Sequence, residues 1–165
     1  MITLLISIIL IFIISYSYGI IFNNFFLKKY NYLNFDLGEI VILGFYLLLF
    51  ISIFFHFFIP INYFFIILVS TYAFVNLFLN FYRFKKHFSF NILIIFIISF
   101  IGLISSKSHP DFEWYHLPYL NYLQNFKIVF GIGNLSDFLG YSQAWNDIVA
   151  IFRFPIIDYN VSNLV

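Results

Sequence analysis

The chain has 165 residues, of which 63% are hydrophobic and only 9% are charged, whereas a typical soluble domain carries about 25% charged residues. So few polar side chains can neither cover a water-soluble core nor keep a chain disordered, which leaves a membrane protein. The net charge of +1 and the lack of a basic stripe exclude nucleic acid as a partner. With no cysteine, disulfides and thiolate metal sites are excluded too.

Four uncharged or nearly uncharged segments come first in the chain, at residues 2–22, 40–59, 61–82 and 88–105. A helix needs about 20 apolar residues to cross a bilayer, and strands of a membrane barrel would alternate in polarity. We therefore expect an all-α membrane fold with four transmembrane helices. Pro60 separates the second segment from the third and predicts a tight hairpin there.

Lysine and arginine predict how these segments are oriented. Lys28 and Lys29 follow the first segment, while Arg83, Lys85 and Lys86 follow the third. Loops rich in these residues stay in the cytoplasm. The alternating topology puts both loops on that same side, so the amino terminus and the chain after the fourth segment are expected outside. The positive charges follow the first segment instead of preceding it, which favours an uncleaved span over a signal peptide.

Residues 107–165 differ from the bundle of residues 1–106. They hold five of the seven acidic residues and both tryptophans, and they are expected to lie along the outer membrane interface, where tryptophan is favoured. Ser108 predicts a helix start, and Pro118 predicts a bend or a restart. The spacing of Leu117, Leu120 and Leu123, together with Trp114, predicts an apolar stripe.

A second amphipathic helix is predicted from Gln143 to Phe154. It would be capped by Ser142 and would end before Pro155. Such a helix would lie in the interface plane with three side chains directed toward lipid, namely Ile148, Ile151 and Phe152.

The main candidates for chemistry are Asp111, Glu113 and His116. A carboxylate at the mouth of a membrane pocket can act as a base or hold a divalent cation, and a neighbouring histidine can bind phosphate. The alternative is that these are polar boundary residues that cap a helix. Glu113 and His116 also have a spacing found in di-metal bundles, but the four segments supply no further carboxylates. No cofactor is firmly predicted, and a divalent cation is the open option.

Three of the polar side chains inside the apolar segments are candidates for a specific role. His56 lies near the outer end of the second segment, where it is either a functional group or a neutral histidine hydrogen-bonded at the interface. Asn76 and Asn80 are four residues apart in the third segment and predict hydrogen bonds between helices.

Three blocks of sequence follow in order within about 40 residues: Asp111-Phe-Glu-Trp-Tyr115-His116-Leu117-Pro118, then Gly131-Ile-Gly133-Asn134-Leu135, then Gly140-Tyr141-Ser142-Gln143-Ala144-Trp145. Their order and spacing resemble large bacterial polytopic proteins of the GT-C glycosyltransferase kind. The resemblance covers Asp111 to Phe152, while the apolar first half is generic.

The resemblance implies an integral membrane enzyme that moves a sugar from a polyprenyl-phosphate donor to an acceptor outside the cytoplasm of a bacterial inner membrane. Asp111 would be the catalytic base. Glu113, Tyr115 and His116 would shape the site or meet the donor phosphate, and Asn134 and Trp145 would support the loop.

The family proteins continue for hundreds of residues beyond this pattern, so the chain is expected to be the amino-terminal part of such an enzyme. The rest of a split transferase is then a possible partner, besides the bilayer and the lipid-linked donor. The alternative function is a non-catalytic membrane subunit or scaffold, or an inactive truncated remnant.

Overall fold

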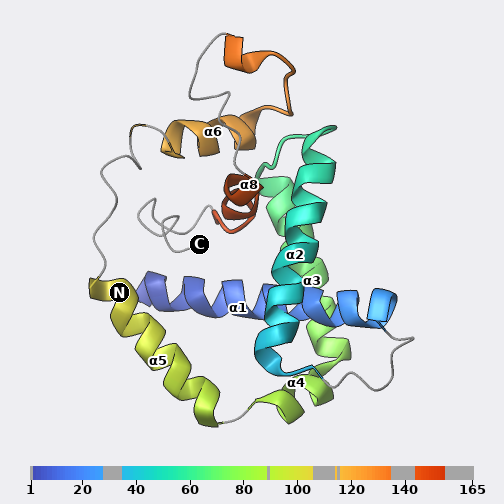
Figure 1. Ribbon diagram of the computed structural model, residues 1–165, viewed down its shortest axis with the longest axis vertical. Coiled ribbons are helices and arrows are strands. Elements are labelled where there is room, and N and C mark those ends of the chain that lie inside the picture. The colour runs from blue at the N-terminus through green and yellow to red at the C-terminus, as the bar shows by residue number, and fades with distance from the viewer. Residues whose placement is uncertain are drawn as a thin grey trace. The chain divides into compact units, whose positions relative to one another are not determined.

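The structure is a computed structural model, and it describes residues 2–27, 35–88, 90–105, 114, 116–134 and 144–154 (Figure 1). Every regular element in these residues is helical, so the predicted all-α class is confirmed for the described part of the chain. In chain order the elements are α1 (Ile2–Phe22), η1 (Asn23–Leu27), α2 (Leu37–His56), α3 (Tyr63–Leu79), α4 (Phe81–His87), α5 (Phe90–Ser105), α6 (Leu117–Asn125), η3 (Ile132–Asn134) and α8 (Ala144–Ile151).

Two of the helices are long and apolar enough to cross a membrane on their own. They are the continuous helix Leu5–Leu27, which joins α1 to η1, and α2. The helices α3 and α4 meet this criterion only as a pair, and the pair is bent by 79°. The apolar part of α5, Ile92–Gly102, is shorter. The described residues therefore contain two candidate spans, or three with the bent pair, where the sequence predicted four.

The chain forms two compact units. Unit 1 comprises Met1–Leu48 and Ser70–Lys107, and unit 2 comprises Leu49–Val69 and Ser108–Val165. Consequently α2 and α3 each begin in one unit and end in the other. The two units are defined by how the chain packs and not by a membrane. The boundary between a membrane bundle and an external segment, expected near residue 106, therefore stays a prediction.

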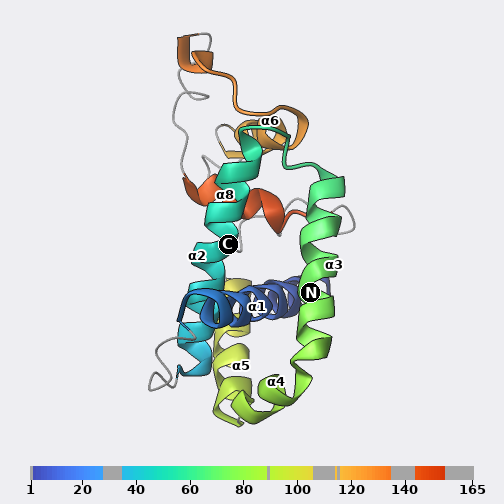
Figure 2. The ribbon, with the colours of Figure 1, turned by 90° about the vertical axis from the view of Figure 1, so that its right-hand side faces the viewer.

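Helix α1 forms the centre of unit 1. Seven successive residues, Ile14 to Ile20, are buried, which means that the middle of this helix is covered on all sides. Figure 2 shows α1 running between the first half of α2 and the second half of α3, and across both of them. Two aromatic contacts join it to the other helices of the unit: Phe12 packs edge-on against Phe96 of α5, and Tyr16 packs against Phe84 of α4.

Two glycines allow α1 and α2 to touch backbone to backbone. A Cβ atom on Gly19 would overlap the backbone carbonyl of Ile40, and a Cβ atom on Gly44 would overlap that of Ser15. Neither position has room for any side chain. Because lipid tails are as apolar as the helices themselves, helices in a membrane associate through such close packing more than through the hydrophobic effect.

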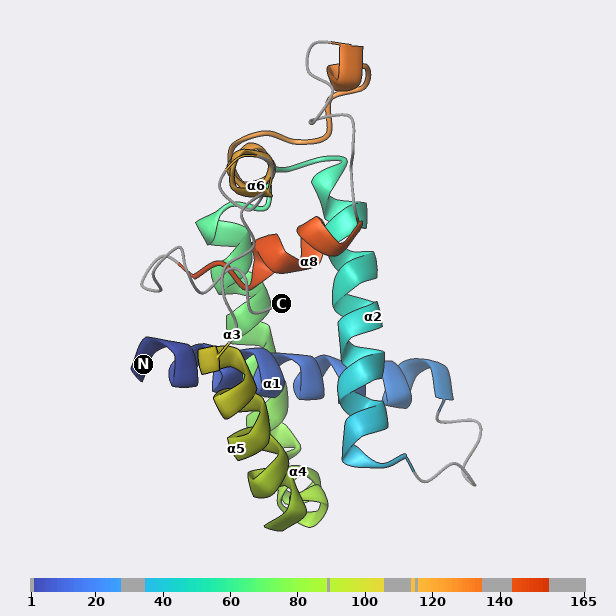
Figure 3. The same cartoon turned by 60° about the vertical axis from the view of Figure 1, so that its left-hand side comes forward.

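Unit 2 is built around the turn between α2 and α3. Figure 3 shows α6 and α8 packed against each other in this unit. Two backbone hydrogen bonds fix the segment around the end of α6 to the turn, one from Ile61 N to Leu123 O at 2.9 Å and one from Ile128 N to His56 O at 3.0 Å. The segment that carries the sequence blocks is thereby attached to the ends of the two apolar helices.

The predicted amphipathic helix near the end of the chain exists as α8, but its predicted orientation toward lipid is wrong. Ile148, Ile151 and Phe152 are 1%, 0% and 5% exposed because they pack inside unit 2. Asn146 and Asp147 are also buried, so α8 is covered on its polar side as well. An apolar stripe shows only that a surface avoids water, and here protein covers that surface.

The apolar stripe predicted for α6 is confirmed in part. The helix begins at Leu117 with Pro118 in its first turn, at the predicted restart. Leu120 and Leu123 are buried, whereas Trp114 is 76% exposed and does not join them.

Candidate functional site

Three of the predicted site residues, Asp111, Glu113 and Tyr115, lie outside the described residues. Their roles therefore stay predictions. The same holds for the helix start expected at Ser108.

The other three predicted site residues lie in unit 2, on three different elements. His116 immediately precedes α6 and is partly buried. Asn134 ends η3 and is exposed, and Trp145 lies in the first turn of α8 with 53% of its surface exposed. One compact unit thus carries the described residues of all three sequence blocks.

The second block contains a turn that requires glycine. Gly131 has a φ of 81°, a backbone conformation that other residues adopt only at a cost. The backbone N–H of Asn134 donates to the carbonyl of Gly131 at 2.9 Å and closes the turn. The first glycine of this block is thus explained by backbone geometry.

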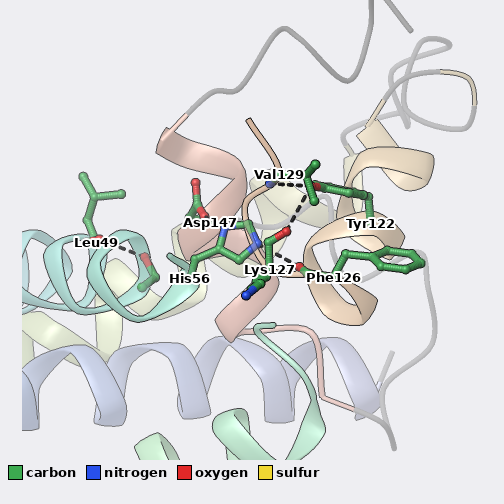
Figure 4. A network of polar contacts seen from close by, with 8 residues as sticks. Leu49, His56, Tyr122, Phe126, Lys127, Val129 and Asp147 are labelled. Atoms are coloured by element: carbon green, nitrogen blue, oxygen red, sulfur yellow. Dashed lines mark hydrogen bonds and ion pairs between the residues drawn. The ribbon is translucent and has the colours of Figure 1, made fainter. Parts of the chain in front are cut away.

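A buried polar network lies where α2, α8 and the end of α6 meet (Figure 4). The His56 side chain is 1% exposed, and its Nδ1 lies 3.1 Å from Oδ1 of Asp147. Its Nε2 lies 3.0 Å from the carbonyl oxygen of Phe126. Oδ1 of Asp147 is buried and has no hydrogen-bond partner within the described ranges, so its contact with Nδ1 is a close approach without hydrogen-bond geometry.

The contact of Nε2 fixes which ring nitrogen carries a proton. A carbonyl oxygen only accepts, so Nε2 carries a proton that it donates to Phe126. The other ring nitrogen, Nδ1, faces the carboxylate of Asp147 at ion-pair distance.

This geometry distinguishes the two interpretations left open for His56. The side chain is almost fully buried, with Nε2 hydrogen-bonded to Phe126 and Nδ1 beside a carboxylate. The imidazole therefore cannot reach a substrate in this arrangement, and its hydrogen bond agrees with the simpler interpretation. It also has a carboxylate neighbour, which that interpretation did not include.

Asp147 was missed in the sequence because it lies far along the chain from His56. A usable signal existed nevertheless. A histidine in an apolar helix needs a partner, and Asp147 is one of only seven acidic residues in the chain. Its position in the first turn of a predicted amphipathic helix made it a candidate.

A second polar cluster lies in unit 1, between α1 and α3. Ser17 Oγ donates to the carbonyl of Ala73 at 2.7 Å, and Asn76 Nδ2 donates to the backbone oxygen and to Oγ of Ser17, both at 2.9 Å. Asn80 in turn donates to Asn76. The predicted hydrogen bonding between helices is confirmed for Asn76.

No group of three or more histidine, aspartate or glutamate side chains that could hold a metal ion occurs among the residues that the structure describes. Asp111 and Glu113, the acidic residues of the first block, lie outside that part of the chain.

Comparison with protein families gives one match. The family described as Domain of unknown function (DUF8201) matches residues 1–165. The chain belongs to this family. No curated protein and no solved structure matches the sequence.

Proposed function

We propose that this membrane protein takes part in moving a sugar from a polyprenyl-phosphate donor to an acceptor outside the cytoplasm. Asp111 acts as the base, and His116, Asn134 and Trp145 support the site together with Glu113 and Tyr115. The proposal rests on the three sequence blocks, which resemble those of GT-C glycosyltransferases.

One structural observation supports the proposal. The described parts of the blocks lie in the same compact unit as the α2–α3 turn. Backbone hydrogen bonds from Ile61 to Leu123 and from Ile128 to His56 tie the chain between the first two blocks to that turn. A transferase that takes its donor from the bilayer needs its site next to the ends of membrane helices, because the phosphate of the donor lies at the headgroup level.

The proposed topology places this turn outside the cytoplasm of a bacterial inner membrane, with the amino terminus on the same side and with α1, α2, α3 and α5 as spans. Helix α3 starts at the turn and leads into α4, which carries Arg83, Lys85 and Lys86. Basic residues stay in the cytoplasm, so the opposite end of α3 faces outward.

The absence of cysteine in the chain makes this topology directly testable. A single cysteine at Phe130, which is 86% exposed in unit 2, should react with a membrane-impermeant maleimide in intact cells. A single cysteine at Lys85 should react only after permeabilisation. The reverse pattern would contradict the proposed orientation.

The reaction itself is tested with proteoliposomes and a panel of labelled polyprenyl-phosphate sugars. If Asp111 is the base, Asp111→Asn should lower turnover of the accepted donor by about 10²–10⁴-fold. Asp158→Asn, which removes a carboxylate outside the three blocks, is the matched control and should keep wild-type turnover. Equal turnover in Asp111→Asn and wild type would refute the assignment.

The second candidate function is a non-catalytic membrane subunit or scaffold. It is favoured by the large exposed aromatic surface of the helices, for which Phe25, Phe78 and Tyr82 are examples with exposures of 84%, 82% and 82%. Aromatic side chains supply much of the contact energy at protein interfaces. Wild-type protein that leaves every donor of the panel intact would favour this function over the transferase.

A further inference from the structure

His56 connects the segments that carry the second and third sequence blocks. Its Nε2 donates to Phe126 O and its backbone oxygen accepts from Ile128 N, which fixes the segment leading to Gly131. Its Nδ1 faces Asp147, two residues after Trp145. We propose that His56 is a positioning residue, whose imidazole holds α8 against the end of α2 through its ion pair with Asp147.

The helix dipoles favour the charged form of this pair. His56 is the last residue of α2, where the free carbonyl groups give the helix end a partial negative charge. Asp147 lies in the first turn of α8, where the free N–H groups give a partial positive charge. Each charge is therefore stabilised by its own helix as well as by its partner, although both side chains are buried.

The other charged side chains that the structure describes in unit 2 are Arg153 and Lys127. Asp147 is the only carboxylate in the part of unit 2 that the structure describes. Arg153, which follows α8, donates to Asn121 Oδ1 at 2.7 Å, and the Lys127 side chain is exposed. The remaining titratable residues described in this unit are Tyr63, His116, Tyr119 and Tyr122. Tyr122 donates to the backbone oxygen of Lys127 and accepts from the N–H of Val129.

The experiment uses two buried alanines as reporters. Ala150 of α8 and Ala73 of α3 are both 0% exposed, and the chain has no other cysteine to interfere. In full-length protein carrying Ala150→Cys or Ala73→Cys, the rate of maleimide labelling is divided by the rate in denaturing detergent at the same pH. This ratio removes the intrinsic pH dependence of thiol reactivity and reports how often each site opens.

His56→Gln should raise the labelling ratio at Ala150→Cys by about 100-fold or more, because a buried carboxylate then loses its charged partner. The ratio at Ala73→Cys should change by no more than about twofold, because this reporter lies in the other compact unit and independent sites do not influence each other. An unchanged ratio at Ala150→Cys, or an equal increase at both reporters, would overturn the proposal.

The consequence for sugar transfer rests on the proposed function, whereas the docking of α8 does not. If Asp111→Asn keeps full turnover but the labelling results hold, the transferase proposal fails and the role of His56 in docking stands. If turnover depends on Asp111 but His56→Gln leaves α8 closed, only the positioning role fails.

Discussion

The two compact units are stabilised by different means. In unit 1, α1 meets its neighbours through backbone contacts at Gly19 and Gly44 and through neutral hydrogen bonds from Asn76. In unit 2, the irregular segments around α6 and α8 are fixed by backbone hydrogen bonds and by the buried pair His56–Asp147. Regular helices satisfy their own backbone groups and need only close contact, whereas irregular segments need polar partners from other elements.

This difference can be tested one unit at a time with Ala73→Cys for unit 1 and Ala150→Cys for unit 2. The labelling ratio of each reporter converts into a free energy of local opening. A substitution should affect the reporter of its own unit and leave the other unchanged.

The largest effect is expected for Asp147→Ala. It removes the buried carboxylate that faces His56, and breaking a buried ion pair costs about 3–5 kcal/mol in comparable sites. The free energy of opening at Ala150→Cys should fall by this amount and that at Ala73→Cys should not change. Asp36→Ala, which removes an exposed carboxylate in unit 1, is the control, and a similar loss in both variants would contradict the account.

Gly44→Ala should act on the other unit. Its new Cβ would overlap the backbone of Ser15, which cannot move aside as a side chain could. We expect a loss of about 1–3 kcal/mol at Ala73→Cys, the usual cost of overpacking. Gly38→Ala is a matched control in the same helix, because nothing lies within 4 Å of its Cβ position. If both glycine variants behave alike, close approach of α1 and α2 does not stabilise unit 1.

A smaller and more local effect is expected at the turn of the second block. Gly131→Ala forces a side chain into a left-handed conformation, at a cost of about 1–2 kcal/mol. Gly131→Asn should recover most of this loss, since asparagine adopts that conformation more readily. Hydrogen exchange at the Asn134 amide, which donates to Gly131 O, measures the opening of the turn. Equal exchange in all three proteins would show that the turn does not need glycine.

The smallest effect is expected for Asn76→Ala, which removes the hydrogen bonds to Ser17. Such bonds between membrane helices contribute about 0.6 kcal/mol on average. The opening free energy at Ala73→Cys should fall by about that value. A loss as large as that of Gly44→Ala would mean that polar contacts, and not close packing, dominate unit 1.

The sequence predicted the helices well because long apolar runs and prolines are local signals. The turn at Pro60, the start of α6 beside Pro118 and the existence of α8 all follow from such signals. The number of spans was harder, because the third apolar run contains a 79° bend between α3 and α4 that composition does not reveal.

The orientation of side chains was predicted less well, for a physical reason. Ile148 and Phe152 would have the same hydrophobic spacing whether they faced lipid or a protein core, and they face the core of unit 2. The same ambiguity concealed the pair His56–Asp147, because only the fold brings these distant residues within 3.1 Å.

The most direct test of the account is a double-mutant cycle on His56 and Asp147 in the Ala150→Cys protein. The free energy of opening is measured for the parent, for His56→Gln, for Asp147→Ala and for the double variant. We predict that the double variant loses less than the sum of the single losses by about 1.5 kcal/mol or more, as expected for a close charge pair. Losses that add within about 0.5 kcal/mol would show that the two residues act independently, and would contradict the claim that the ion pair between His56 and Asp147 holds α8 in place.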